Sequence, residues 1–317
     1  MDFLTYLSLG QTALELGLIC SLTALALFLS YSMLNVCDMS TDGCFTLGAA
    51  VGAVVALGGH PWLALPAAMM AGVCSGFVVA LLQTRMGVNS LLAGIIVNTA
   101  LYSVNIAAMG GSSLMNLNKT DTVFTLAKSA LSDTAISGQY KLLVAVVVVI
   151  IALAAVTAFL RTRLGLAIRA TGDNPTMVRS SSVNTAFTTT VGLCASNALT
   201  ALSGCLMAQS QKSVDINLGT GMVTIALASL LIGGTILGKG GIFKRALGVV
   251  IGSIIFRIVY TIALRLNMPA FMLKAVSSVI VVLAISLPYL KTQYPLYKRR
   301  IKARRDNKHE KGEYKAC

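Results

Sequence analysis

The chain has 317 residues and a mass of 33.1 kDa, a length that in a soluble protein usually gives two domains of about 150 residues each. Its composition excludes that class, because 56% of the residues are hydrophobic and only 11% are charged, against about 25% charged residues in soluble domains. The mean hydropathy is +0.80 and the formal net charge is +14. We therefore expect an all-α polytopic membrane protein.

Half of the net positive charge comes from the last 27 residues. Residues 291–317 contain ten Lys and Arg residues and three acids, a net charge of +7, and the other 290 residues contribute the remaining +7. A basic flank beside an apolar segment is typical of the cytoplasmic side of a membrane and of contact with anionic lipid. We therefore divide the chain into a transmembrane domain, residues 1–290, and a basic cytoplasmic tail, residues 291–317. Membrane lipid is an expected partner and nucleic acid is not.

Apolar runs of about 20 residues, the length that crosses a bilayer, recur along the transmembrane domain. Residues 3–14 are a candidate for an interfacial helix before the first run. The runs predict about nine helices, with eight to ten as the range: 16–37, 43–59, 61–84, 88–108, 142–160, 185–209, 217–238, 246–264 and 271–290. The run 43–59 is short. The run 217–238 opens with Asn-Leu-Gly-Thr-Gly, which favours one broken or re-entrant helix.

The distribution of Lys and Arg between the loops predicts the orientation. With alternating spans, the loops on the side of the tail and the tail itself contain eighteen basic residues, and the opposite loops contain five. Because cytoplasmic loops are enriched in Lys and Arg, we expect the C-terminus inside and the N-terminus outside.

Two spans share a glycine spacing. Gly72-Val-Cys-Ser-Gly76 and Gly248-Val-Val-Ile-Gly252 lie in spans that run in opposite directions in this topology. This is the pattern of an inverted repeat, which in transporters flanks a central pathway. The alternative is that both motifs are only faces for close helix packing.

Motifs for catalysis, ATP binding and metal binding are incomplete. Gly233–Lys239 fits a Walker A loop up to the last position, where Gly240 replaces the Ser or Thr that ligates Mg²⁺. The seven cysteines include no CxxC pair and the two histidines are far apart, so neither a disulfide nor a metal site is indicated. Asp38 and Asp42 flank a turn that we expect to cap the next helix. We expect no enzymatic activity and no cofactor.

Three polar side chains fall near the middles of separate spans: Asn98, Asn197 and Arg257. Amides at such positions commonly link helices by hydrogen bonds, whereas a charge is tolerated only where protein or water solvates it. Arg257 is therefore either a buried structural residue or a residue of a solute pathway. All three are candidates for a translocation pathway.

Residues 161–184 are too polar to cross a membrane and too long for a simple turn, so we expect a cytoplasmic loop. Asn174 followed by Pro175 predicts a helix N-cap and a proline in the first turn. A short helix from Pro175 to Ser182 is expected to lie along the inner face. It is either a docking element for a partner or a solvated connector.

This loop resembles the coupling segment of permease subunits in the bacterial ABC-importer family that serves branched-chain amino acids, ribose and related solutes. The matching pattern is Gly165-Leu-Ala-Ile-Arg169-Ala-Thr-Gly172-Asp-Asn174, then Met177 and Val183-Asn184-Thr185. Further motifs are most similar to the tryptophan/tyrosine-type branch: Asp38-Met-Ser-Thr-Asp42-Gly43 with Gly48, Asn197-Ala-Leu-Thr-Ala-Leu-Ser-Gly204 with Ala208-Gln209, and Asp215-Ile-Asn-Leu-Gly219-Thr-Gly221. The similarity covers about residues 16–290.

The resemblance implies the permease subunit of an importer in the bacterial inner membrane, for an amino acid or a similar small polar solute. It implies cytoplasmic ATPase subunits, an extracytoplasmic solute-binding protein, and a second permease copy or a related permease as partners. The expected ATPase-coupling residues are Gly165, Arg169, Gly172, Asp173, Asn174, Pro175, Met177, Val178 and Arg179.

Two departures from the family pattern bear on these expectations. Related sequences usually carry Gly where Ser182 stands, which affects how the short helix ends, and many carry an acid near Gly234 that could pair with Arg257. The alternative function is a secondary transporter driven by an ion gradient. Such a protein needs paired intramembrane carboxylates or an unwound helix that binds ions, and only residues 217–221 suggest the latter.

Overall fold

The computed structural model describes residues 3–118, 120–130, 139–237 and 240–265, together with residues 275, 278–283 and 286. The first half of the chain contains α1 (Phe3–Leu27) with its π-helical continuation η1 (Phe28–Met33), α2 (Thr41–Leu57), α3 (Pro61–Thr84), α4 (Ser90–Ala108), β1 (Leu114–Asn116) and α5 (Val123–Ala130). The second half contains α6 (Tyr140–Arg161), α7 (Arg163–Asp173), α8 (Pro175–Ser180), α9 (Thr185–Gln211), β2 (Ser213–Asp215), α10 (Met222–Leu237) and α11 (Ile242–Arg265).

The helical, polytopic character expected from the sequence is confirmed. Six described helical segments are long and apolar enough to cross a membrane, namely α1 with η1, α3, α4, α6, α9 and α11. The apolar helices α2 and α10 are shorter. The number of nine spans is not confirmed, because the predicted span 271–290 lies largely outside the described residues, as does the tail 291–317. Residues 3–14 form no separate interfacial helix but belong to the continuous helix α1.

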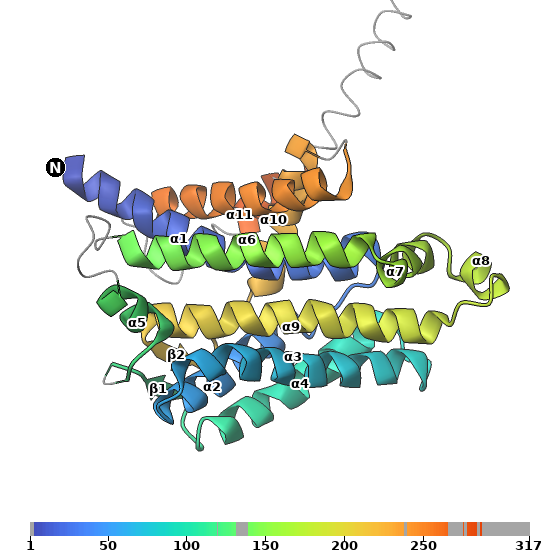
Figure 1. Cartoon of the computed structure of the whole chain (residues 1–317), viewed down its shortest axis with the longest axis horizontal. Coiled ribbons are helices and arrows are strands. Elements are labelled where there is room, and N and C mark those ends of the chain that lie inside the picture. The colour runs from blue at the N-terminus through green and yellow to red at the C-terminus, as the bar shows by residue number, and fades with distance from the viewer. Residues whose placement is uncertain are drawn as a thin grey trace, which may run out of the picture.

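The helices form a bundle with two distinct ends (Figure 1). At one end lie the N-terminal end of α1, the helix α5 and the antiparallel pair β1–β2, in which Leu114 is opposite Asp215. At the other end lie α7 and α8. Helices α1 and α9 run in opposite directions between these ends. The structure thus places residues 114–116 and 175–180 at opposite ends of the bundle, as the predicted topology requires.

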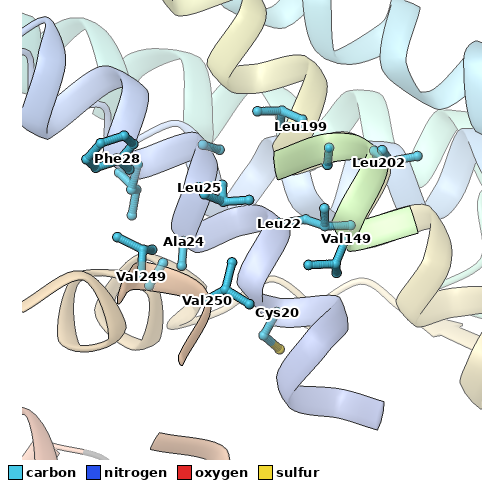
Figure 2. Packing of buried hydrophobic residues seen from close by; sticks show 14 of the residues in the cluster. Cys20, Leu22, Ala24, Leu25, Phe28, Val149, Leu199, Leu202, Val249 and Val250 are labelled. Carbon is cyan, nitrogen blue, oxygen red and sulfur yellow. The ribbon is translucent and has the colours of Figure 1, made fainter. Parts of the chain in front are cut away.

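Helices α1 and α9 form the centre of the bundle. In the most apolar stretches of α1–η1 and α9, 83% and 78% of the residues are buried, against 28% in α4. Figure 2 shows side chains of α1 packed between α6, α9 and α11, with Leu22, Val149 and Leu202 close together. The helices with the lower buried fractions leave apolar faces exposed, as expected of surfaces that contact lipid or a protein partner.

Small and hydroxyl residues hold the central helices together. Three serine hydroxyls donate across helix interfaces to carbonyls of α1: Ser196 to Ala26 at 2.8 Å, Ser203 to Ile19 at 2.7 Å and Ser253 to Gly17 at 2.9 Å. In a membrane the hydrophobic effect does not drive helix association, so close backbone packing and such bonds, about 0.6 kcal/mol each, do so instead. Serine hydroxyls of α9 and α11 therefore link both helices to α1.

Two interrupted helices distinguish this bundle. Helix α2 begins after the non-helical residues 34–40, and α10 begins after β2 and the turn 216–221. The expected break at 217–221 is therefore confirmed. The order of a long helix, a break, a short helix and a long helix occurs twice, in α1–α2–α3 and in α9–α10–α11.

The glycine motifs of α3 and α11 both lie at close helix contacts. A Cβ atom on Gly72 would overlap the Asn197 carbonyl of α9, whereas one on Gly252 would overlap the Ser229 carbonyl of α10. The two motifs therefore approach different neighbours. The shared glycine spacing is therefore explained by close helix packing in each half.

Candidate solute passage and coupling segment

The carboxylate of Asp42 joins the two interrupted helices. Asp42 lies in the first turn of α2, and its Oδ2 accepts from the Gly221 N–H at 2.9 Å while its Oδ1 accepts from the Val223 N–H at 2.8 Å. Both donors are at the start of α10, where a helix has free N–H groups. The expectation that Asp42 caps its own helix was wrong, because the long-range fold brings the start of α10 to its carboxylate.

Asp38 fixes the break before α2. Its side chain is 1% exposed. Its Oδ1 accepts from the backbone N–H and the hydroxyl of Ser40, and its Oδ2 accepts from Asn197 Nδ2 at 2.8 Å. Three donors therefore compensate the buried carboxylate. Asn197, one of the three pathway candidates, is fully buried in this contact and links α9 to the break.

A polar cavity of about 300 Å³ lies beside the start of both short helices. Residues from the first turn of α2, from α4 and from the turn before α10 line it: Asp42, Gly43, Thr46, Asn98, Thr99, Tyr102, Asn105, Ile216, Asn217 and Thr220. Eight of these ten side chains carry an oxygen or nitrogen atom, which is unusual for an apolar bundle. Of the pathway candidates, only Asn98 lines this cavity.

Asn105 has an unused acceptor in the cavity wall. Its Nδ2 donates to the Gly43 carbonyl at 3.1 Å, and the side chain is 1% exposed. Its Oδ1 is buried and has no hydrogen-bond partner among the described residues. Buried polar atoms are normally paired, so this oxygen is an unsatisfied acceptor in the wall of the cavity, covered by neighbouring atoms.

Arg257 lies away from the cavity, on the face of α11 that meets α1. Its Nη2 is 3.5 Å from Cys20 Sγ, and its guanidinium carbon is 5.5 Å from the ring centre of Tyr260. Its Nε is buried without a hydrogen-bond partner in the described part of the chain. Gly234, which the sequence comparison related to Arg257, faces open space.

Helix α7 is fixed to the bundle by two glycines. A Cβ atom on Gly165 would overlap the Phe159 carbonyl of α6, and one on Gly172 would overlap the Met33 carbonyl at the end of η1. Between them Ile168 is fully buried, and Arg169, another expected coupling residue, is half-buried. The glycines therefore let the backbone of α7 lie directly on the inner ends of other helices.

Helix α8 is short and its two ends are specified by local sequence. The expected cap is confirmed, because Asn174 Oδ1 accepts from the Met177 N–H at 3.1 Å and Pro175 occupies the first turn. At the other end the Ser182 N–H donates to the Arg179 carbonyl and the Val183 N–H to the Val178 carbonyl, a Schellman motif. The helix ends at Ser180, two residues before the expected end.

The exposed surface of α8 differs from the expected one. Met177 is 67% exposed, and Asp173 and Arg179 are also exposed, with Arg179 Nε donating to Thr185 Oγ1 at 3.0 Å. Val178 is only 7% exposed. Because the helix turns Val178 toward the bundle, Val178 is part of the support of α8 and not of its free surface.

Sequence reasoning missed most of the cavity. Thr99, Tyr102 and Asn105 were not singled out, although Tyr102 and Asn105 follow Asn98 at helical spacing, and Asn217 and Thr220 were noted only as part of the break 217–221. A polar face on an otherwise apolar span was the available signal. Asn217 and Thr220 could be assigned to the same site only after the turn 216–221 was seen beside α2.

Comparisons with known proteins agree with this architecture. Residues 11–285 match the family described as "Branched-chain amino acid transport system / permease component". The chain is 32% identical over 267 residues to the "Tyrosine transport system permease protein" of Clostridioides difficile (strain R20291), covering 84% of this chain and 86% of that protein. It is 29% identical over 279 residues to the uncharacterized protein RP368 of Rickettsia prowazekii (strain Madrid E), covering 87% and 96%.

No solved structure gives a significant match to the chain. The family match extends over more than four fifths of the residues and includes both interrupted helices, the cavity and the α7–α8 segment. The chain belongs to the family of permease components of branched-chain amino acid transport systems.

Proposed function

We propose that this chain is the transmembrane permease subunit of an ABC importer for an amino acid or a similar small polar solute. It forms the passage, and separate cytoplasmic ATPase subunits supply the energy. A second permease copy or a related permease completes the passage, and an extracytoplasmic binding protein delivers the solute. The importer lies in the bacterial inner membrane with the N-terminus of this chain outside and its basic tail inside, against lipid headgroups.

The α7–α8 segment is the observation that carries this proposal. An isolated helix of six residues is unstable in water, yet α8 is capped at both ends and rests on buried Val178. Its Met177 is exposed. A rigid projecting helix with a free apolar side chain is suited to a groove on a partner, whereas a simple connector needs no such support.

The contacts of the same segment connect α7 mechanically to the residues around the cavity. Gly172 of α7 lies against Met33 and Leu34, which begin the stretch that leads to Asp38. Asp38 holds this stretch to α9, and Asp42, four residues later, holds the start of α10. Displacement of α7 by an ATPase would thus act on the residues that shape the cavity.

The alternative, a secondary transporter driven by an ion gradient, draws support from the two broken helices. However, Asp38 and Asp42, the carboxylates at the two breaks, have structural hydrogen bonds from backbone, hydroxyl or amide donors. The third described carboxylate within a span, Glu15 of α1, accepts from Gln11 Nε2 at 3.0 Å. Among the described residues there is no cluster of three or more His, Cys, Asp or Glu side chains. The two proposals differ in whether the chain requires an ATPase.

Co-purification tests the coupling surface. Met177→Asp places a charge on the free surface of α8 and leaves Val178 in place, so we expect normal insertion but loss of the co-purifying ATPase. Met86→Asp is the control, because Met86 is 65% exposed in the turn between α3 and α4, outside α7–α8. If Met177→Asp still co-purifies with an active ATPase at full stoichiometry, the docking assignment is contradicted. The same holds if only Met86→Asp loses the ATPase.

A further inference from the structure

The cavity between α2, α4 and the turn 216–221 contains separated charges of opposite sign. Among its ten described lining residues, only Asp42 is charged. The cavity also lies at the N-terminal ends of α2 and α10, and each such end carries roughly half a positive elementary charge. One carboxylate and two helix ends sum to about zero. A solute of net charge zero that itself separates two charges therefore matches the cavity.

The carboxylate of Asp42 and the unpaired oxygen of Asn105 are the acceptors that the cavity wall offers to the positive group of such a solute. Each carboxylate oxygen of Asp42 accepts one backbone N–H and keeps capacity for a further donor. Asn105 Oδ1 is an acceptor with no partner among the described residues, in a side chain that is 99% buried. Both atoms belong to side chains of the cavity wall. Together they are suited to an ammonium group, which has three donors and no acceptor.

The rest of the wall offers donors for a negative group and a surface for a side chain. Asn98, Asn217 and Thr220 contribute amide or hydroxyl donors to the wall, and within the described part of the chain no hydrogen bond between helices uses these donors. Tyr102, 52% exposed, adds an aromatic ring. The volume of about 300 Å³ is at the lower end of the range for ligand pockets, which suits a single amino acid and excludes a peptide.

We propose that this cavity is a binding site for the zwitterionic backbone of a free amino acid, with the ammonium group between Asp42 and Asn105 and the carboxylate toward the donors of α4 and the turn 216–221. The proposal rests on the proposed function, since it assigns the cavity to the passage. It adds a site of solute recognition within the permease chain itself. Recognition of the backbone at this site would be shared by different amino acids.

Protection of an engineered cysteine tests the site directly. Thr99 is exposed in the cavity wall and its hydroxyl bonds only to the Ile95 carbonyl of its own helix. The full chain with Thr99→Cys, in a background where Cys37, Cys74, Cys194 and Cys317 are serine, is placed in lipid nanodiscs and modified with a small maleimide. Ser112→Cys, exposed outside the cavity, is the matched control.

The probes separate the zwitterion from its parts. L-tyrosine, L-leucine and L-glutamine share the backbone, whereas tyramine lacks the carboxylate and 3-(4-hydroxyphenyl)propionate lacks the ammonium group. We expect at least one amino acid to slow modification of Thr99→Cys about five-fold or more and both truncated probes to slow it less than two-fold. Ser112→Cys should not respond. Equal protection by tyramine, or protection by none of the amino acids, would overturn the proposal.

Two variants in the Thr99→Cys background test the named groups. Asn105→Leu removes the free acceptor and should abolish protection. Asn98→Leu removes no hydrogen bond among the described residues and replaces an amide donor for the carboxylate by an apolar group of similar shape, so it should abolish protection even if Asn105→Leu fails to fold. Protection retained in a folded Asn98→Leu protein would contradict the site. ATP-driven uptake by Thr99→Cys without protection in nanodiscs would remove the site alone. Protection in nanodiscs together with uptake that needs no ATPase would remove the proposed function alone.

Discussion

Gly48 of α2 lies directly against the backbone of Ala201 in α9, so closely that a Cβ atom on Gly48 would overlap the Ala201 carbonyl oxygen. Gly204 makes the reciprocal approach, toward the Phe45 carbonyl. These contacts place the short helix α2, and with it Asp42, at a fixed depth beside the central helix α9.

Gly48→Ala is expected to lower stability by about 1–3 kcal/mol, because the overlapping atoms are backbone and cannot move aside. Gly234→Ala is the control, since Gly234 lies in helix α10 with open space around its Cα. There an alanine is expected to raise stability by about 0.5–1 kcal/mol through its higher helix propensity. Thermal unfolding followed by fluorescence-detected size exclusion measures both. Equal melting temperatures for the two variants would contradict the close packing.

Ser182→Gly is expected to stabilise the end of α8. Ser182 has a φ of +62°, in the left-handed region that favours glycine, and removing this strain gains about 1 kcal/mol. Hydrogen exchange of the peptide 175–183 should therefore slow about five-fold. Ser180→Gly, the same change inside the helix, should accelerate exchange. Faster exchange in Ser182→Gly would show that the left-handed conformation is not the native one.

Arg257→Leu is expected to have opposite effects on stability and function. An intramembrane Arg costs about 2.5–3.5 kcal/mol, and Arg257 has no ion-pair partner among the described residues, so leucine should raise the melting temperature of the purified chain. If the charge is retained for assembly or transport, uptake should fall. Arg257→Lys, which keeps the charge, should restore part of the uptake. Unchanged uptake in a stable Arg257→Leu protein would show that the side chain is dispensable.

Cysteine labelling in intact cells tests the orientation. Ser112 and Ser181 are both exposed. Ser112 comes two residues before β1 and Ser181 directly follows α8, and these two elements lie at opposite ends of the bundle (Figure 1). A membrane-impermeant maleimide should modify Ser112→Cys and not Ser181→Cys, and both should react after the cells are permeabilised. The reverse pattern would place the N-terminus inside.

The features that could be predicted from sequence are those that depend on neighbouring residues. Hydropathy located the described spans, and the Asn174–Pro175 pair located the start of α8, because a cap and its helix are adjacent in the chain. The expectation that position 182 affects how the short helix ends agrees with the positive φ of Ser182.

The features that could not be predicted depend on contacts between distant parts of the chain. The bond from Val223 to Asp42 spans 181 residues, so the capping rule alone assigned Asp42 to the wrong helix. The burial of Val178 depends on how α8 folds back onto the bundle, which a six-residue sequence does not encode. Similarly, Asn98, Asn197 and Arg257 were grouped by depth in the membrane, but the fold places only Asn98 in the cavity.

Reconstituted uptake tests the central claim most directly. The chain is incorporated into proteoliposomes with and without its ATPase and binding protein, and uptake of radiolabelled L-tyrosine and of a mixture of amino acids is measured with ATP or with an imposed sodium or proton gradient. We predict uptake only when the ATPase, the binding protein and ATP are all present. Uptake by the chain alone, driven by either gradient and indifferent to ATP, would contradict the assignment as an ABC-importer permease.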